Sequence, residues 1–375
     1  MVKTILFDVD GVLLSEEHYF DASALTVWEM LTSKNYLGLS PEKFKTNYTA
    51  SEIKEIREHV FVNDKVLKFM KSRGLNANWD MIYLSFSHQL IHLLSQIKEH
   101  ELDQIKKWCQ SPITRETLLE MGKVLSNYEV KTNFSLFLED FKRSEATKQE
   151  LLDYLNKLAK EKVGVETTIF LKGELWSVCE HVSQEWYVGD EHVLASTGRP
   201  SVQIGKKGFL ANETTLASKE EISKLFQYLT TSGYTIGIGT GRPELETILP
   251  FHHLNWLQYF EEKRIVTADE VLKAEQLLPV TKSLSKPHPF TYIMGLKGKD
   301  TPALDCLNTV LPIENGEEVL VVGDSLADLL AARQLGCQFA AVLTGLSGKD
   351  ARSEFEKQEA DYILDSVLDI KGILE

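Results

Sequence analysis

The sequence predicts an α/β fold in which a mostly parallel sheet is covered by helices and is interrupted by a large, mainly α-helical insertion. From about residue 209 onward, short β-rich runs alternate with helix-like stretches, which is typical of a parallel sheet. Another β-rich run lies near the start of the chain, far from the others. The predicted division is therefore a core of residues 1–15 and 209–375 and an inserted domain of residues 16–208.

The strands of the core are expected at short runs of β-branched and apolar residues. They are Thr4–Phe7, Tyr234–Gly239, Arg264–Thr267, Val319–Val322 and Phe339–Leu343. A helix is expected over Ser218–Leu229, ahead of the second strand. Ligands of such a sheet bind beyond the carboxyl ends of its strands, so functional residues are sought there.

The insertion has the apolar periodicity of helices, with apolar or aromatic residues three and four positions apart. Two examples are the sets Tyr83, Phe86, Leu90, Leu93, Leu94, Ile97 and Leu151, Leu152, Leu155, Leu158. Its other aromatic residues are expected in the core of the insertion rather than in a pocket, among them Phe134, Phe137, Phe141, Trp176, Trp186 and Tyr187. Lys206 and Lys207 are expected to be solvated.

Composition indicates a soluble globular protein located in the cytoplasm. The chain has 375 residues, of which 43% are hydrophobic, and this is enough for two domains. No stretch qualifies as a membrane span, and the start of the chain does not resemble a signal peptide. The four cysteines are widely spaced, which argues against a disulfide framework or a zinc site. The net charge of −14 argues against nucleic acid as a partner.

The acidic charge is concentrated in the predicted core. Residues 16–208 carry 25 basic and 28 acidic side chains, a net charge of −3, so the rest of the chain carries −11. Several carboxylates crowded together would repel one another unless a divalent cation neutralised them. The core, which also contains the motifs described next, is therefore expected to hold a metal.

Two carboxylates follow the first predicted strand. Asp8 and Asp10 are separated by one residue and are followed by Gly11, which permits a sharp turn. One carboxylate could attack a phosphorus centre to form an aspartyl-phosphate, while the other donates a proton to the leaving oxygen and later takes one from water. An ordinary turn after a strand remains the alternative. A calcium-binding EF-hand loop is excluded, because Tyr19 stands where that loop requires Glu.

Two further motifs carry a hydroxyl and a cation. The hydroxyl of Thr240 and the backbone N–H of Gly241, directly after the second strand, could hold phosphate oxygens, whereas Arg242 is expected in an ion pair or at a helix start. A dinucleotide-binding loop is excluded, because Glu244 replaces its third glycine. Lys286 precedes the first proline of a Lys-Pro-His-Pro run, on a stiff loop, where its charge could stabilise a phosphoryl transition state. Taken alone, it would be an ordinary surface lysine.

A second pair of carboxylates follows the strand Val319–Val322. Asp324 would lie at the strand end beside Asp8, and Asp328, four residues on, would lie on the same face of the following helix. Both could then bind one cation. The alternative is that Asp324 caps the helix and Asp328 is a solvated helix residue.

Together, Asp8-x-Asp10-Gly11, Thr240-Gly241, Lys286-Pro-x-Pro and Gly323-Asp-x-x-x-Asp328 resemble the four motifs of the haloacid dehalogenase-like (HAD) hydrolase superfamily. The resemblance covers residues 1–15 and about 209–375 and implies a Rossmann-like core. It implies that Asp8 is the nucleophile, Asp10 the general acid/base, Thr240 and Gly241 phosphate ligands, and Lys286 the stabilising cation. It also implies Mg²⁺ held by Asp8, the backbone carbonyl of Asp10, and Asp324, with Asp328 assisting.

The resemblance narrows the expected chemistry. Family members that keep an acid two positions after the nucleophile are phosphatases and phosphomutases, so Asp10 favours phosphoryl transfer. An insertion between motifs one and two resembles the C1 type of cap domain, although this one is much larger than usual. The expected function is a Mg²⁺-dependent phosphatase acting on a small phosphorylated metabolite through an aspartyl-phosphate on Asp8. A phosphomutase and a non-catalytic binding or scaffold protein are the alternatives.

Overall fold

The computed structural model describes residues 2–75, 77–147, 149–280 and 283–374. Contacts between Cα atoms divide the chain into two compact units, one formed by Met1–Glu17 with Leu210–Glu375 and the other by His18–Phe209. The first unit is referred to below as the core unit and the second as the inserted unit. We propose that they correspond to the two domains expected from the sequence.

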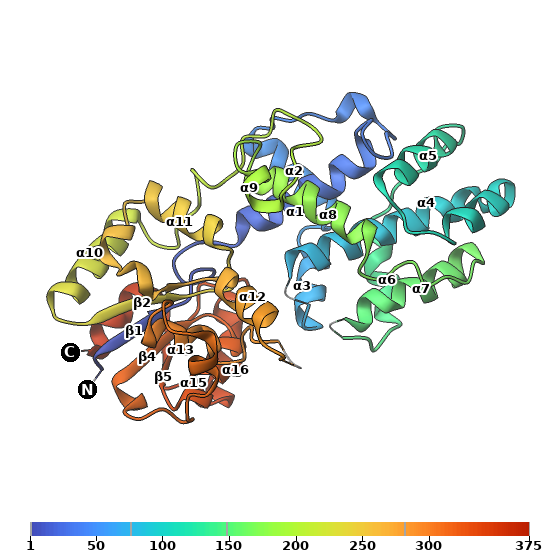
Figure 1. The fold of residues 1–375 in the computed structure, drawn as a ribbon. Coiled ribbons are helices and arrows are strands. Elements are labelled where there is room, and N and C mark those ends of the chain that lie inside the picture. The colour runs from blue at the N-terminus through green and yellow to red at the C-terminus, as the bar shows by residue number, and fades with distance from the viewer. Residues whose placement is uncertain (1, 76, 148, 281–282, 375) are drawn as a thin grey trace. The chain divides into compact units, whose positions relative to one another are not determined.

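The core unit is built on a parallel sheet of six strands in the order β3-β2-β1-β4-β5-β6. Figure 1 labels β1, β2, β4 and β5 of this sheet. The strands are β1 (Thr4–Phe7), β2 (Thr235–Gly239), β3 (Ile265–Val266), β4 (Val319–Gly323), β5 (Gln338–Val342) and β6 (Tyr362–Leu364). Every neighbouring pair is parallel, which confirms the predicted α/β class. Strand β6 was not expected from the sequence, because it is only three residues long and partly exposed.

Helices cover both faces of this sheet. They are α10 (Lys219–Thr231), α11 (Glu244–His253), α12 (Ala268–Leu277), α13 (Phe290–Lys297), α14 (Ala303–Leu307), α15 (Leu326–Leu335), α16 (Arg352–Lys357) and α17 (Lys371–Leu374). Ile5 and Phe7 pack with the buried face of α10, whereas Leu6 packs with α13 and α15. Successive strand residues point to opposite faces, so both faces of the central strands are buried.

Helix α10 illustrates how local sequence sets an element. Ser218 accepts a hydrogen bond from the N–H of Glu221, whose side chain in turn accepts from Ser218, so the first turn is capped in both directions. Ile222 and Leu225 then face the sheet, and both are buried. The predicted helix Ser218–Leu229 thus begins one residue later and ends two residues later, at Thr231.

The inserted unit is helical. Its helices are α1 (Glu17–Thr32), α2 (Ala50–Val60), α3 (Lys65–Ser72), α4 (Asn78–Trp108), α5 (Arg115–Leu125), α6 (Leu136–Lys142), α7 (Glu150–Val163), α8 (Glu174–Tyr187) and α9 (Val193–Thr197). Both apolar sets singled out in the sequence are buried, one in α4 and the other in α7. Short 3₁₀-helices complete the two units: η1 (Pro41–Lys43), η2 (Leu257–Tyr259), η3 (Glu262–Arg264), η4 (Gly316–Glu318), η5 (Gly348–Ala351) and η6 (Val367–Ile370).

One lysine of the inserted unit is buried, although the sequence predicted that it would be exposed to solvent. Lys207 is exposed as expected, but the side chain of Lys206 is fully buried. Its Nζ lies 2.6 Å from Glu29 Oε2 and 2.5 Å from Glu185 Oε2, and both glutamate side chains are fully buried as well. Two carboxylates from distant parts of the chain pair with this ammonium and so allow it to be buried. The sequence alone does not reveal this pairing.

The two segments of the core unit that flank the insertion pair with each other. The N–H of Ser15 donates to the carbonyl of Thr214 at 2.8 Å, and the N–H of Leu216 donates to the carbonyl of Leu13 at 3.1 Å. Leu14 forms an antiparallel bridge with Thr215 between these bonds. The chain therefore leaves and re-enters the core unit at one place.

The structure also bears on the cysteines and on membrane-spanning helices. The cysteines Cys109, Cys179, Cys306 and Cys337 are buried free thiols. Among the helices of the described residues, none combines the length and the apolar character needed to cross a membrane. The cytoplasmic location stays a prediction.

Candidate active site

Asp8 stands at the carboxyl end of the central strand β1. Its N–H donates to the carbonyl of Val322 at 2.9 Å, which continues the pairing of β1 with β4. Its Oδ1 accepts from the N–H of Val9 at 2.8 Å, so the carboxylate is held in place from its own backbone. The residue is buried. In a parallel sheet this position is the usual location for a ligand-binding group.

Lys286 contacts Asp8 directly. Its Nζ lies 2.9 Å from Asp8 Oδ2 and 2.7 Å from Asp328 Oδ1, and it donates to the carbonyl of Gly239 at 3.3 Å. Its side chain is 12% exposed, so it is not an ordinary surface lysine. Burial disfavours the ammonium, but the carboxylates of Asp328 and Asp8 outweigh this and raise the pKa of Lys286 above its usual value.

Asp328 lies in the first turn of α15 and is fully buried. The hydroxyl of Ser325 caps the helix by accepting from the N–H of Asp328 at 3.3 Å, and it lies 2.6 Å from Asp328 Oδ2. The hydroxyl of Tyr292 donates to Asp328 Oδ1 at 2.7 Å. The alternative of a capping Asp324 and a solvated Asp328 is therefore wrong. No sequence motif pointed to Tyr292, because it lies on a different helix.

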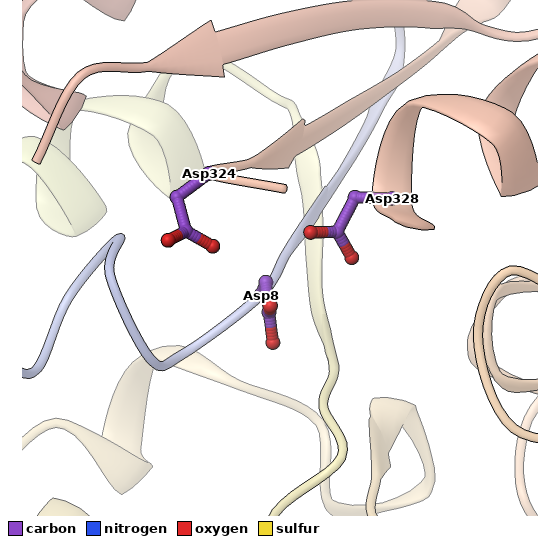
Figure 2. A group of neighbouring side chains, drawn as sticks. All are labelled: Asp8, Asp324 and Asp328. Carbon is purple, nitrogen blue, oxygen red and sulfur yellow. The ribbon is translucent and has the colours of Figure 1, made fainter. Parts of the chain in front are cut away.

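The carboxylates of Asp8, Asp324 and Asp328 converge in one place (Figure 2). One oxygen from each lies within 4.8 Å of the others, close enough to ligate one cation. Gly11 and Gly345 both approach Asp324 so closely that a Cβ at either position would overlap its carboxylate. The requirement for glycine at position 11 was visible in the motif, whereas Gly345 was missed because it lies outside any motif.

The charges at this site favour a bound cation. Three carboxylates come together here, and the ammonium of Lys286 contacts those of Asp8 and Asp328. Burial raises the pKa of Asp8 to about 6, and the carboxylate of Asp328 adds to the effect, although Lys286 opposes both. Lys286 alone thus does not balance the negative charge. Carboxylate oxygens are the ligands that Mg²⁺ prefers, so the group fits a magnesium ion.

Asp10 stands apart from this carboxylate group. Its side chain is 26% exposed, and its Oδ1 lies 3.6 Å from Arg242 Nε. Partial burial holds the pKa of Asp10 above its usual range; Arg242 opposes this shift, and the nearby carboxylates of Glu16, Asp8 and Glu213 favour it. A carboxyl group that retains its proton near neutral pH is suited to donate that proton.

The predicted phosphate-binding motif follows the neighbouring strand β2. Thr240 is buried, its N–H donates to the carbonyl of Val266 at 3.0 Å, and its Oγ1 accepts from the N–H of Arg242 at 3.1 Å. Gly241 is exposed, and a Cβ there would meet no atom of the chain within 4 Å. The fold places both residues at the same edge of the sheet as Asp8, and their binding of phosphate stays a proposal.

Arg242 forms the ion pair that the sequence favoured for it. Its guanidinium is buried and donates from Nη2 to Glu213 Oε1. Glu213 was missed in the sequence analysis, because a glutamate between the insertion and α10 has no distinguishing neighbours. The pair adds an arginine and a second acid to the surroundings of Asp10.

Comparison with known proteins assigns part of this chain to a family. Residues 283–370 match the family model described as HAD-hydrolase-like, and this segment contains Lys286, Asp324 and Asp328. The chain belongs to the HAD-like hydrolase superfamily. This HAD-like hydrolase is 38% identical to a crystal structure solved by the Northeast Structural Genomics Consortium, with a TM-score of 0.90; the alignment covers 100% of this chain and 98% of that chain.

Other solved structures are less similar to this chain. A predicted phosphoglycolate phosphatase from Haemophilus somnus 129PT is 14% identical, with a TM-score of 0.42 and coverage of 100% of this chain and 98% of that chain. CbbY from Rhodobacter sphaeroides, solved in complex with phosphate, is 12% identical, with a TM-score of 0.38 and coverage of 99% and 96%. Comparison with curated proteins found no match.

Proposed function

We propose that this HAD-like hydrolase is a Mg²⁺-dependent phosphatase that acts on a small phosphorylated metabolite through an aspartyl-phosphate on Asp8. One observation carries the proposal: the Asp8 carboxylate is contacted by Lys286 and lies in one group with Asp324 and Asp328. A nucleophile, a cation and candidate metal ligands thus meet at the carboxyl end of β1.

The residues divide the reaction into two steps. In the first, a carboxylate oxygen of Asp8 attacks phosphorus, the bond from phosphorus to the ester oxygen breaks, and Asp10 donates a proton to the departing oxygen. In the second, water attacks the aspartyl-phosphate while Asp10 takes a proton from it, which releases inorganic phosphate and restores Asp8. Lys286 offsets the negative charge that develops on the phosphoryl oxygens.

The proposed metal would be held by Asp8, Asp324 and the backbone carbonyl of Asp10, with Asp328 assisting. A bound Mg²⁺ supplies positive charge next to the phosphoryl group. The hydroxyl of Thr240 and the N–H of Gly241 would hold phosphoryl oxygens. The role of the inserted unit would be that of a cap, which in enzymes of this kind excludes water and contributes to substrate choice.

The test measures phosphate release from a panel of phosphorylated metabolites and a generic aryl phosphate, with Mg²⁺ or with EDTA. We expect metal-dependent release that Asp8→Asn abolishes and that Asp350→Asn, at an exposed aspartate of the core unit, leaves intact. Undiminished hydrolysis by Asp8→Asn would rule out Asp8 as the nucleophile. Isomerisation of a sugar phosphate without phosphate release would identify a phosphomutase. Absence of Mg²⁺ binding, together with a stoichiometric protein partner, would indicate a scaffold.

A further inference from the structure

Arg242 is an arginine with almost no access to solvent. Its side chain is 1% exposed, and so is that of its partner Glu213. Burying a guanidinium is costly unless it is paired and hydrogen-bonded, and here Nη2 donates to Glu213 Oε1. A second carboxylate beside the guanidinium is that of Asp10, whose Oδ1 lies 3.6 Å from Nε. The buried pair of Arg242 and Glu213 therefore lies next to Asp10, the proposed acid/base, and this suggests a functional role for the pair.

The backbone at both ends of this arrangement is fixed. The N–H of Arg242 donates to Thr240 Oγ1 at 3.1 Å, and its carbonyl accepts from Ala268 at 2.9 Å. On the other side, Glu213 directly precedes Thr214, whose carbonyl accepts from the N–H of Ser15. The guanidinium therefore has little freedom to move away from Asp10.

Asp10 depends more on its neighbours for its orientation. The Oδ1 of Asp8 accepts from the N–H of the next residue, which holds that carboxylate in place. The side chain of Asp10, by contrast, is partly exposed. The distance to Arg242 Nε is longer than a hydrogen bond, so the attraction is electrostatic and leaves the carboxyl group able to exchange a proton. Glu213 occupies Nη2, and this directs the Nε side of the guanidinium toward Asp10.

From this geometry we infer that Arg242 is a positioning residue for Asp10, and that Glu213, on the segment returning from the inserted unit, fixes Arg242 for that role. The inference rests on the proposed function, in which Asp10 is the general acid/base. Arg242 orients the carboxyl group toward the reacting oxygen and does not itself touch the substrate. The predicted consequence is an energetic link between Glu213 and Asp10 through one guanidinium.

The test is a double-mutant cycle on turnover of an aryl phosphate. Glu213→Gln keeps the shape of the side chain and removes its charge, and Arg242→Lys keeps the charge and removes the fork of donors. In the otherwise native enzyme we expect each to lower kcat by about tenfold with little change in KM, since acid/base catalysis contributes about 10²–10⁴-fold in total. In an Asp10→Asn background we expect either change to alter kcat by about twofold or less, because the residue they position has lost its function.

The controls separate positioning from a loss of folding and from a failure of the proposed function. Glu317→Gln and Arg333→Lys change an exposed glutamate and an exposed ion-paired arginine of the core unit and should leave kcat unchanged. Equal losses of kcat in the native and Asp10→Asn backgrounds, or no loss in either, would overturn the inference. If the native enzyme releases no phosphate, the proposed function fails. The inference is then tested by comparing the position of the Asp10 carboxyl group in crystal structures of the native and Glu213→Gln proteins. An unmoved Asp10 carboxyl group would refute it, and a displaced one would support it.

Discussion

The buried charge cluster of the inserted unit provides the sharpest test of stability. Replacing Lys206 with Met removes the ammonium that lies 2.6 Å from Glu29 and 2.5 Å from Glu185, and leaves two carboxylates buried together. Breaking a buried ion pair by removing one partner typically costs about 3–5 kcal/mol. For a unit of this size that loss corresponds to a fall in the unfolding temperature on the order of 10 °C.

Calorimetry and urea denaturation measure this effect, with fluorescence as a local probe because Lys206 Nζ lies 5.0 Å from the ring centre of Trp186. Lys207→Met, one position away at an exposed lysine, is the matched control and should change stability little. Combining Lys206→Met with Glu29→Gln should recover part of the loss, because only one charge then stays buried. A Lys206→Met protein within about 1 kcal/mol of the native one would refute the reasoning.

Three further predictions concern single side chains. Gly345→Ala should push the Asp324 carboxylate from its place and weaken Mg²⁺ binding by about tenfold or more, as measured by titration calorimetry. Tyr292→Phe should lower the unfolding free energy by about 1–3 kcal/mol in urea, because the buried Asp328 oxygen loses a donor. Burial raises the pKa of Glu29 from 4.5 to about 7, although Lys206 opposes this shift. The folded protein therefore holds a proton on Glu29 more tightly than the unfolded chain does. The stability that this proton provides is complete below pH 4.5 and is lost as the pH rises through 7. Glu29→Gln should therefore remove up to about 3 kcal/mol of pH dependence between these values.

Matched variants control each of these three predictions. Gly372→Ala adds a Cβ where no atom lies within 4 Å and should not affect Mg²⁺ binding. Tyr362→Phe removes a partly buried hydroxyl that pairs with Gln338 and should cost less than Tyr292→Phe. Glu220→Gln, at an exposed glutamate, should leave the pH profile unchanged. Unaltered Mg²⁺ affinity, unaltered stability or an unaltered pH profile in the corresponding test variant would contradict that prediction.

The sequence predicted the parts of this molecule that depend on local pattern. Five of the six strands were expected from short apolar runs, although some boundaries moved by one residue, as with β3, which runs over Ile265–Val266 instead of Arg264–Thr267. The motif residues Asp8, Lys286 and Asp328 were singled out, and the structure brings them into contact. Each taken alone had an ordinary reading, and only their order along the chain favoured a shared site.

The side-chain roles that the sequence did not reveal depend on long-range contacts. Tyr292 and Gly345 contact residues of the site from segments that carry no motif. The role of Glu213 depends on its pairing with Arg242, which lies 29 positions away in the sequence. Lys206 was expected in solvent because lysine is seldom buried without partners, and its partners lie far away in sequence, at residues 29 and 185. Charge pairing across the chain leaves no periodic trace.

The pairing of Ser15 with Thr214 has a consequence for how such a protein can change over time. A hydrogen bond of 2.8 Å joins the residue before the insertion to a residue after it, so the two attachment points are already neighbours within the core unit. Exchanging the inserted segment for a shorter or longer one would then require no rearrangement of the sheet or of the carboxylate group. The insertion is modular at its junction, so the inserted segment can be replaced while Asp8, Lys286 and Asp328 keep their contacts.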